Sequence, residues 1–376
     1  MTDKTSQGAV PVRGAVPVRG AVPVPEAVAI PSGQAGYLIR VAARAPSLHN
    51  TQPWRFKVLP DGIELYADHS RQLGTDPIGR ELLISCGAAL YGLRLAVRSL
   101  GRTPEVELFG DPAGRLAGPA GLRLVARVRL GAPAPMAAAE RKMLEAVPHR
   151  HTHRGPFEPA PLPAGLLTGL QQDATTEGAT LAVIDLDRVG RKLAAILTTA
   201  SRDQDLDPVS RAEILRWTRD ASSQARDGVP AHAFPAQPGR SPGCPSPGCP
   251  SPEWLPQRDF DLGRGLGLLT AGGPPAAVTG VLVTAGDNEE DWLRAGQALN
   301  RLLLHAASQW VFARLQTQPL QAGTIRDLIG TRLALPGVPQ MLLQFGVART
   351  AHATGRRPAA DLTDPTHPGA ETDTEC

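Results

Sequence analysis

Residues 45–56 read APSLHNTQPWRF, a short polar loop that two prolines bracket and that leads into a strand-like segment. Pro46 and Pro53 fix their own φ angles and bias the preceding residues towards extended backbone, so the loop is held open. Its hydrogen-bonding side chains are those of Ser47, His49, Asn50 and Gln52. So many donors and acceptors on a short backbone suit the edge of a flat heterocycle. The alternative is a proline-rich turn whose polar groups face water.

Length and composition place the chain among globular proteins. Its 376 residues allow two domains or one large one, and hydrophobic residues make up 42%. No apolar run reaches the roughly 18–20 residues that span a bilayer, and the first residues do not have the pattern of a signal peptide. Four cysteines, two of them in a low-complexity stretch, fit a reducing compartment. We therefore expect a cytoplasmic protein that does not enter a membrane.

The charges do not indicate a nucleic-acid partner. The net charge is +3, and only four of the 39 basic residues are lysines. The arginines are scattered among acidic residues and do not form a basic stripe, which nucleic-acid binding requires.

Hydrophobic periodicity predicts an α+β fold. Helices are expected over residues 37–43, 82–100, 137–146, 187–200, 208–222 and 292–310. Strands are expected over residues 54–58, 63–66, 106–109, 122–130, 181–184, 278–284 and 341–347. A proline-rich linker over 131–135 separates a first half, residues 33–135, from a second half, residues 136–350.

Two segments and the tail are expected to lie outside the packed core. Residues 8–25 repeat a proline-containing hexapeptide (GAVPVR, GAVPVR, GAVPVP), which predicts a disordered arm over 1–32. A Pro/Gly-rich insertion at 226–258 contains two copies of SPGCP and predicts a loop or lid. Its two cysteines, Cys244 and Cys249, reflect the repeat and not a metal or redox pair. The polar tail over 351–376 is expected to be loose.

Two of the expected helices resemble each other. Residues 86–96 (CGAALYGLRLA) and 295–305 (AGQALNRLLLH) share a glycine, an alanine and three leucines at aligned positions. The match suggests an internal duplication, although five identities in leucine-rich helices also arise by chance.

Residues 149–154 read HRHTHR, in which basic and aromatic side chains alternate. In extended backbone, Arg150, Thr152 and Arg154 point to one face and the three histidines to the other. Two guanidinium groups and a hydroxyl on one face suit a phosphate group. The alternatives are a solvated basic turn and, for the histidine face, a metal site; no nearby carboxylate or cysteine completes a ligand set, so no metal is expected.

The quoted loop closely resembles the flavin loop of the nitroreductase-like FMN proteins. The resemblance extends to residues 148–157 (PHRHTHRGPF) and 335–348 (LPGVPQMLLQFGVA), and it covers most of residues 33–350. It is greatest to the actinobacterial, dormancy-associated branch, in which one chain holds two nitroreductase-like halves. The resemblance implies two tandem halves, each with a mostly antiparallel sheet flanked by helices, which together imitate a homodimer within one monomeric chain.

The resemblance also implies which residues bind FMN. Those matching the ring loop are Pro46, Ser47, Asn50 and Gln52, with His49 either a ring contact or a structural histidine. Those matching the phosphate element are Arg150, Thr152 and Arg154, with Arg356 and Arg357 as a C-terminal basic pair. Trp54 is expected in the core. The first half lacks a phosphate element and the second half lacks a ring loop, so one flavin site is expected per chain, built by the first half against the second.

The resemblance implies an oxidoreductase that passes hydride from NAD(P)H through FMN to a small electron acceptor such as a nitroaromatic or a quinone. No catalytic side chain is required, because the chemistry resides on the flavin. Two features point to an alternative, a catalytically poor protein that binds or stores FMN. The family's glycine near flavin N5 is missing from residues 318–321 (QPLQ), and the insertion at 226–258 is long enough to cover the flavin.

Overall fold

In a computed structural model of the chain, residues 28–108, 121–155, 157–233, 260, 262, 264, 277–348 and 354–363 are described. Most of the expected N-terminal arm, both copies of SPGCP and the last residues of the tail lie outside these ranges. The described part of the insertion at 226–258 is residues 226–233.

The first half contains a four-stranded antiparallel sheet. Its strands, in spatial order, are β1 (Trp54–Leu59), β2 (Gly62–Asp68), β4 (Leu122–Pro133) and β3 (Arg102–Leu108). The helices of this half are α1 (Gln34–Ala43) and α2 (Arg80–Ser99). Alternating apolar residues of β2 and β4 face these helices, so the sheet buries one face against them.

The second half contains a second four-stranded antiparallel sheet with the same pattern of connections. Its strands, in spatial order, are β5 (Thr180–Ile184), β8 (Val278–Thr284), β10 (Val338–Val347) and β9 (Val311–Leu315). The accompanying helices are α3 (Ala138–Ala146), α4 (Leu166–Thr176), α7 (Glu289–Ala307) and α8 (Gly323–Arg332). The expected α+β fold, with two antiparallel sheets flanked by helices, is confirmed.

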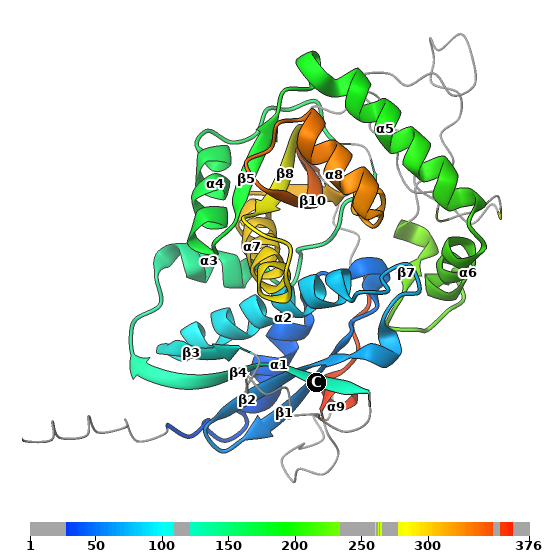
Figure 1. Ribbon diagram of the computed structural model, residues 1–376. Helices are drawn as coiled ribbons and strands as arrows, with labels where there is room; N and C mark the ends of the chain where they lie inside the picture. Colours follow the sequence, from blue (N-terminus) through cyan, green and yellow to red (C-terminus); the bar gives the residue numbers. More distant parts are fainter. Residues whose placement is uncertain are drawn as a thin grey trace, which may run out of the picture.

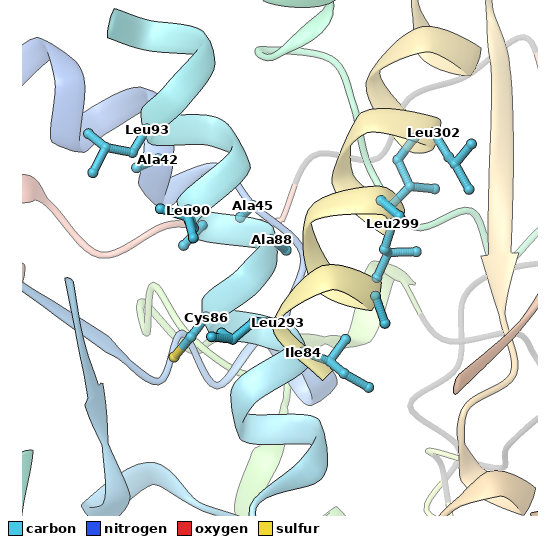
Figure 2. Close-up of a cluster of buried hydrophobic side chains, with 14 of the residues drawn as sticks. Ala42, Ala45, Ile84, Cys86, Ala88, Leu90, Leu93, Leu293, Leu299 and Leu302 are labelled. Atoms are coloured by element: carbon cyan, nitrogen blue, oxygen red, sulfur yellow. The ribbon is translucent and has the colours of Figure 1, made fainter. Parts of the chain in front are cut away.

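Two central helices, α2 and α7, lie side by side between the two sheets (Figure 1). Leu90 and Leu93 lie on the side of α2 that faces α1, whereas Leu299 and Leu302 lie on the far side of α7 (Figure 2). Each helix therefore contributes leucines to the core of its own half while it packs on the other helix. Within the part of the chain that the structure describes, α2 alone is long and apolar enough to cross a membrane; 83% of that stretch is buried inside the fold, as in a core helix.

A helical extension projects from the second half at the side of the molecule (Figure 1). It comprises α5 (Leu186–Leu206) and α6 (Pro208–Trp217), followed by a short parallel pair, β6 (Thr218–Arg219) and β7 (Val229–Pro230). Asp207 caps α6, because its carboxylate accepts from the backbone N–H groups of Val209 and Ser210.

Residues 354–363, which we call the strap, correct the expectation of a loose tail. The strap leaves the second half, crosses to the first, and ends in α9 (Ala359–Leu362) beside β1 (Figure 1). Leu362 is fully buried, and Thr363 forms a parallel bridge with Phe56. The tail is held because β1 is an edge strand with unpaired backbone groups, and because Leu362 reaches the core.

Other boundaries also differ from expectation. The predicted linker at 131–135 is in part strand, because β4 continues to Pro133. The helix predicted over 208–222 ends at Trp217. Ordered chain begins before Gly33, since Val28 bridges Leu130. The sequence reasoning missed α4, α8 and β9.

Candidate functional site

The polar loop, residues 46–52, has strained backbone. His49, Asn50 and Gln52 have φ angles of 50°, 56° and 48°, in the left-handed region that residues with a Cβ rarely adopt. Each such residue costs of the order of 1 kcal/mol, so the surrounding contacts must hold the loop in this shape. One of them is local, because the Ser47 hydroxyl accepts from the Gln52 backbone N–H at 2.9 Å.

The side chains of Asn50 and Gln52 supply the other contacts. Asn50 Nδ2 donates to the carbonyl oxygens of Gly228 and Gly355, each at 3.1 Å. Gln52, which is fully buried, donates to the Arg226 carbonyl at 2.8 Å and accepts from the Arg357 backbone N–H at 2.8 Å. The loop is thus tied to the start of the insertion and to the strap.

A pocket opens between the two halves beside the polar loop. It holds about 980 Å³ of space between atoms, part of it open to solvent. Three of the expected ring contacts, Pro46, Ser47 and His49, line it, together with Leu48. Asn50 and Gln52 are not among its lining residues, and the structure gives them the tying contacts instead. Trp54 is fully buried, as expected for a core residue.

The wall opposite the loop comes from elements of both halves. Glu81, Ile84 and Ser85 of α2 line the pocket, as do Leu299 of α7 and Met341 of β10. A stretch that begins in β9 completes this wall with Arg314, Leu315, Gln316, Thr317, Gln318 and Pro319. Gln318 and Pro319 belong to residues 318–321, which contain no glycine.

Arginines from two distant segments gather beside the pocket. Arg154 and Thr152 line the pocket. Arg150 is 6% exposed, and its Nη2 donates to the Arg44 carbonyl at 2.7 Å. Arg356 of the strap donates through Nη2 to the carbonyl oxygens of Arg44 and Ala45, each at 3.3 Å. We call Arg150, Arg154 and Arg356 the arginine cluster.

The arginine cluster lies in an unfavourable electrostatic environment. Burial lowers the pKa of Arg150 and of Arg154 to about 10. Burial also lowers the pKa of Arg356, and the positive charges of Arg150, Arg44 and Arg154 lower it further. Among the described residues, no carboxylate offsets the charge of Arg150 or Arg356. Positive charges held together in this way fit an anionic ligand.

Two buried donors of the cluster point to the same conclusion. Nη1 of Arg150 and Nε of Arg356 have no hydrogen-bond partner within the described ranges. A buried donor left unsatisfied costs about 1–3 kcal/mol, and more when it is charged. A group with several oxygen atoms, such as a phosphate monoester, would accept from both donors and offset the repulsion between the guanidinium groups. The residues present therefore fit the phosphate of FMN.

Arg357, the other member of the expected basic pair, points elsewhere. Its Nη2 donates to the Asp361 carbonyl at 2.9 Å, and the charges that act on it are those of Arg71, Arg55, Asp68 and Asp361. It is not a member of the arginine cluster.

The histidines that alternate with the cluster pack on aromatic rings. The ring of His149 stacks on Trp310 at 5.1 Å, that of His151 contacts Phe312 at 4.4 Å, and that of His153 stacks on Phe157 at 4.8 Å between centroids. The segment is fixed by backbone pairing with β9, because His153 N–H donates to the Ala313 carbonyl at 2.9 Å. Within the described residues, no group of three or more metal-ligating side chains occurs.

Arg314 of β9 is a pocket residue that the sequence reasoning missed. Its Nη2 donates to the Gly155 carbonyl at 2.7 Å, its guanidinium lies over the Phe157 ring, and burial lowers its pKa to about 10. The sequence did not single out Arg314, because the strand that carries it, β9, was not predicted.

A chain of hydrogen bonds encloses the pocket on the side of the helical extension. Glu213 of α6 accepts from Thr75 Oγ1 at 2.8 Å and lies 3.8 Å from His49 Nε2. Gln321 Nε2 donates to Thr75 Oγ1 at 3.1 Å and to Glu81 Oε2 at 2.9 Å. The contacts of Glu213 with Thr75 and His49 hold helix α6 against the first half.

Two further residues cover the pocket. Ser201 of α5 lines it, and so does Phe260, whose ring lies edge-on to His49 and beneath the Arg154 guanidinium. The cover therefore includes α5, which sequence reasoning had not assigned to it.

Comparison with known proteins places the chain in a family. No protein-family model matches it. It is 33% identical over 318 residues to the Mycobacterium tuberculosis (strain H37Rv) protein named "Putative NAD(P)H nitroreductase Rv3131", covering 83% of this chain and 84% of the relative. It is 27% identical over 329 residues to "Putative NAD(P)H nitroreductase acg" of the same organism, covering 86% of this chain and 93% of the relative.

A solved structure is also similar, although its TM-score of 0.35 is too low to support an argument. It is the FMN-dependent nitroreductase NfnB from Mycobacterium smegmatis in complex with NADPH, which is 15% identical and matches 60% of this chain and 99% of its own. The sequence identity over most of both chains is sufficient by itself: this chain belongs to the nitroreductase-like family.

Proposed function

We propose that the chain binds one FMN in the pocket between its halves and acts as an NAD(P)H-dependent oxidoreductase on a small electrophile such as a nitroaromatic or a quinone. The arginine cluster carries this proposal, because it gathers buried positive charge beside residues 44–45, directly before the polar loop that lines the pocket. The mycobacterial relatives that carry the name NAD(P)H nitroreductase support the same activity.

In this arrangement the residues of the chain bind and orient the cofactor. Arg150, Arg154 and Arg356 would hold the phosphate, with the Thr152 hydroxyl beside them. Pro46, Ser47 and His49 would face the ring. When bound, FMN supplies the redox chemistry, accepting a hydride from NAD(P)H and passing it to the electrophile.

We propose further that the chain is a monomer that imitates a homodimer and has kept one of two sites. The equal strand order of the two sheets supports this, as does the different connection before each first strand. Residues 44–53, which contain the polar loop, join α1 to β1, whereas residues 177–179 alone join α4 to β5. The second half has no room for an equivalent loop.

One structural observation favours a second candidate, a protein that binds FMN without turning it over. Ser201 and Phe260 line the pocket, Glu213 lies 3.8 Å from His49 Nε2, and residues 318–321 lack the glycine that the resemblance implies there. A covered flavin would be shielded from NAD(P)H and from bulky acceptors.

Anaerobic mixing of the FMN-loaded protein with NADPH and with NADH separates the two candidates. Loss of flavin absorbance within seconds supports the oxidoreductase, whereas reduction by dithionite alone supports storage. A protein that cannot be loaded with FMN overturns both.

Substitutions in the arginine cluster test where the phosphate of FMN binds. Exchanging Arg150 and Arg154 together for Gln should abolish FMN retention during gel filtration. Arg123→Ala is the matched control, because its ion pair with Glu289 is half-exposed and remote from the pocket. Equal flavin content in both variants would refute the phosphate assignment.

A further inference from the structure

The strap contributes Arg356 to the arginine cluster and also binds the polar loop, and this double contact extends the proposed FMN site, on which the following inference rests. Towards the arginine cluster, Arg356 donates to the carbonyl oxygens of Arg44 and Ala45. Towards the polar loop, Gly355 accepts from Asn50 Nδ2 at 3.1 Å, and the Arg357 N–H donates to Gln52 Oε1 at 2.8 Å. Of three consecutive strap residues, Arg356 thus belongs to the arginine cluster, whereas Gly355 and Arg357 bind the polar loop.

The polar loop depends on these contacts for its shape. Its three left-handed residues would relax if they were free, and two of them, Asn50 and Gln52, carry the side chains that bind the strap. Both side chains are buried, so each lost bond would leave a buried polar group unsatisfied. A seated strap therefore favours the loop conformation that faces the pocket.

The strap in turn depends on the arginine cluster. Its Arg356 lies within the field of Arg44, Arg150 and Arg154, all of the same sign. An anion bound among these guanidinium groups would attract each of them and so offset their mutual repulsion. It would also accept a hydrogen bond from Nε of Arg356, which has no partner within the described residues. Anion binding therefore lowers the free energy of the seated strap relative to a released one.

We propose that Asn50 and Gln52 are positioning residues that couple the arginine cluster to the polar loop through the strap. An anion bound at the arginine cluster then increases the affinity of the polar loop for a flat, neutral heterocycle. Because coupling is reciprocal, the heterocycle also increases the affinity for the anion.

The test divides the proposed cofactor into two separate ligands. Riboflavin, which carries the ring but no phosphate, is titrated into the flavin-free protein, and binding is followed by the change in its fluorescence. Titrations with saturating inorganic phosphate are compared with titrations in chloride at equal ionic strength. We expect riboflavin to bind at least about fivefold more tightly with phosphate, the lower end of typical coupling between sites.

Asn50→Gly tests whether the coupling depends on the Asn50 side chain. Glycine adopts a positive φ without strain, so this change removes both donors and leaves the backbone conformation accessible. The effect of phosphate on riboflavin affinity should be smaller in this variant, because only the Gln52 contact with the strap remains. Asn300→Ala is the matched control: it removes a buried amide of the same kind, which donates to the Ala88 carbonyl at 2.8 Å between the central helices. It should lose stability but keep the phosphate effect.

A measurement on the unaltered protein keeps the test valid if Asn50→Gly does not fold. Trypsin cleaves after arginine unless proline follows, so cleavage after Arg356 reports release of the strap, whereas the bond between Arg357 and Pro358 resists trypsin. Inorganic phosphate should slow this cleavage at least about fivefold relative to chloride, in line with the same coupling. An unchanged cleavage rate would contradict the proposed effect of the anion on the strap.

The outcomes distinguish this inference from the proposed function. If FMN binds one per chain but phosphate leaves riboflavin affinity unchanged, the coupling is wrong and the FMN site stands. If phosphate strengthens riboflavin binding by the same factor in Asn50→Gly as in the unaltered protein, the strap contact of Asn50 does not carry the coupling. If neither FMN nor riboflavin binds, the inference and the proposed function both fail.

Discussion

Gly296 of α7 lies against Ile84 of α2, and a Cβ added to Gly296 would come within 2.0 Å of the Ile84 carbonyl oxygen. A reciprocal contact joins Gly87 of α2 to Leu293 of α7, where an added Cβ would come within 2.3 Å of the carbonyl oxygen. In the aligned helix sequences, Gly87 pairs with Gly296 and Ile84 with Leu293. A two-fold axis produces such reciprocity, and here both sides belong to one chain. The contact supports the proposal of a duplicated dimer.

Replacing either glycine by alanine should destabilise the protein strongly. The clash is with helix backbone, which cannot move aside without separating α2 from α7, so we expect each change to lower the free energy of unfolding by about 3 kcal/mol. Urea denaturation measures the effect. Gly323→Ala at the start of α8 is the matched control, since nothing lies within 4 Å of the added Cβ. Equal losses in Gly296→Ala and Gly323→Ala would show that close helix packing is not the cause.

The flavin content should be one per chain. In the second half, only three residues connect α4 to β5, and ion pairs lie at this place where the first half has the polar loop. Arg301 pairs with Asp173 at 2.8 Å and with Glu177 at 3.0 Å, and Arg94 pairs with Glu177 at 2.6 Å. Absorbance of protein and released flavin gives the ratio, and light scattering gives the mass of the particle. Two flavins per chain, or a stable dimer, would contradict the single intramolecular site.

The same ion pairs should be structural. Arg301→Ala leaves the buried carboxylate of Glu177 with fewer partners, so we expect it to lower the free energy of unfolding by about 3 kcal/mol. Its FMN content after refolding or at low temperature should equal that of the unaltered protein. Loss of FMN from folded Arg301→Ala would place this network in the cofactor site, although none of its residues lines the pocket.

Arg356 and Arg357 should contribute unequally to FMN binding. Arg356 belongs to the arginine cluster, and a charge-assisted hydrogen bond contributes about 1.5–3 kcal/mol, so Arg356→Ala should weaken FMN binding about ten- to 100-fold. Arg357 directs its guanidinium to Asp361, and Arg357→Ala retains the backbone N–H that binds Gln52, so affinity should change little. Fluorescence titration with FMN measures the affinity of each variant. A larger loss of affinity in Arg357→Ala than in Arg356→Ala would contradict the assignment of Arg356 to the phosphate site.

Local patterns in the sequence predicted much of the fold. The three- and four-residue spacing of leucines predicted α2 and α7, and β8 was predicted with its observed bounds, Val278–Thr284. The alternation at 149–154 predicted two faces; in the structure His151 packs on Phe312, and Arg154 and Thr152 line the pocket. These features depend on neighbouring residues, which is why periodicity reveals them.

What the sequence did not reveal depends on contacts between distant residues. Asn50 and Gln52 have the same types of donor and acceptor whether they bind a flavin ring or the backbone of residues 226–228 and 355–357. The strap has a polar composition typical of a loose tail, and one buried leucine with one strand edge is enough to hold it. Neither outcome follows from local composition.

Asp76, which precedes α2, should make stability depend on pH. It is 4% exposed, and burial raises its pKa to about 6, although the Leu82 N–H donates to its carboxylate at 2.9 Å. In the unfolded chain its pKa is about 3.9. Between these values the folded state binds more protons, so this group stabilises the protein fully below about pH 4, and its contribution is lost as the pH rises through 6.

Asp76→Asn tests this sign, because an amide oxygen still accepts from Leu82 but never ionises. The shift of about two pH units corresponds to up to about 3 kcal/mol, so the variant should be more stable than the unaltered protein at pH 7.5 and equally stable near pH 4. Asp207→Asn is the opposite control: hydrogen bonds from Ser210 and Val209 lower the pKa of Asp207, so its carboxylate stabilises at neutral pH and loses that effect as the pH falls. Urea denaturation at several pH values measures both. A less stable Asp76→Asn at pH 7.5 would mean that the charged carboxylate is favoured where it lies, because the Leu82 N–H and the charge of Arg80 then outweigh its burial.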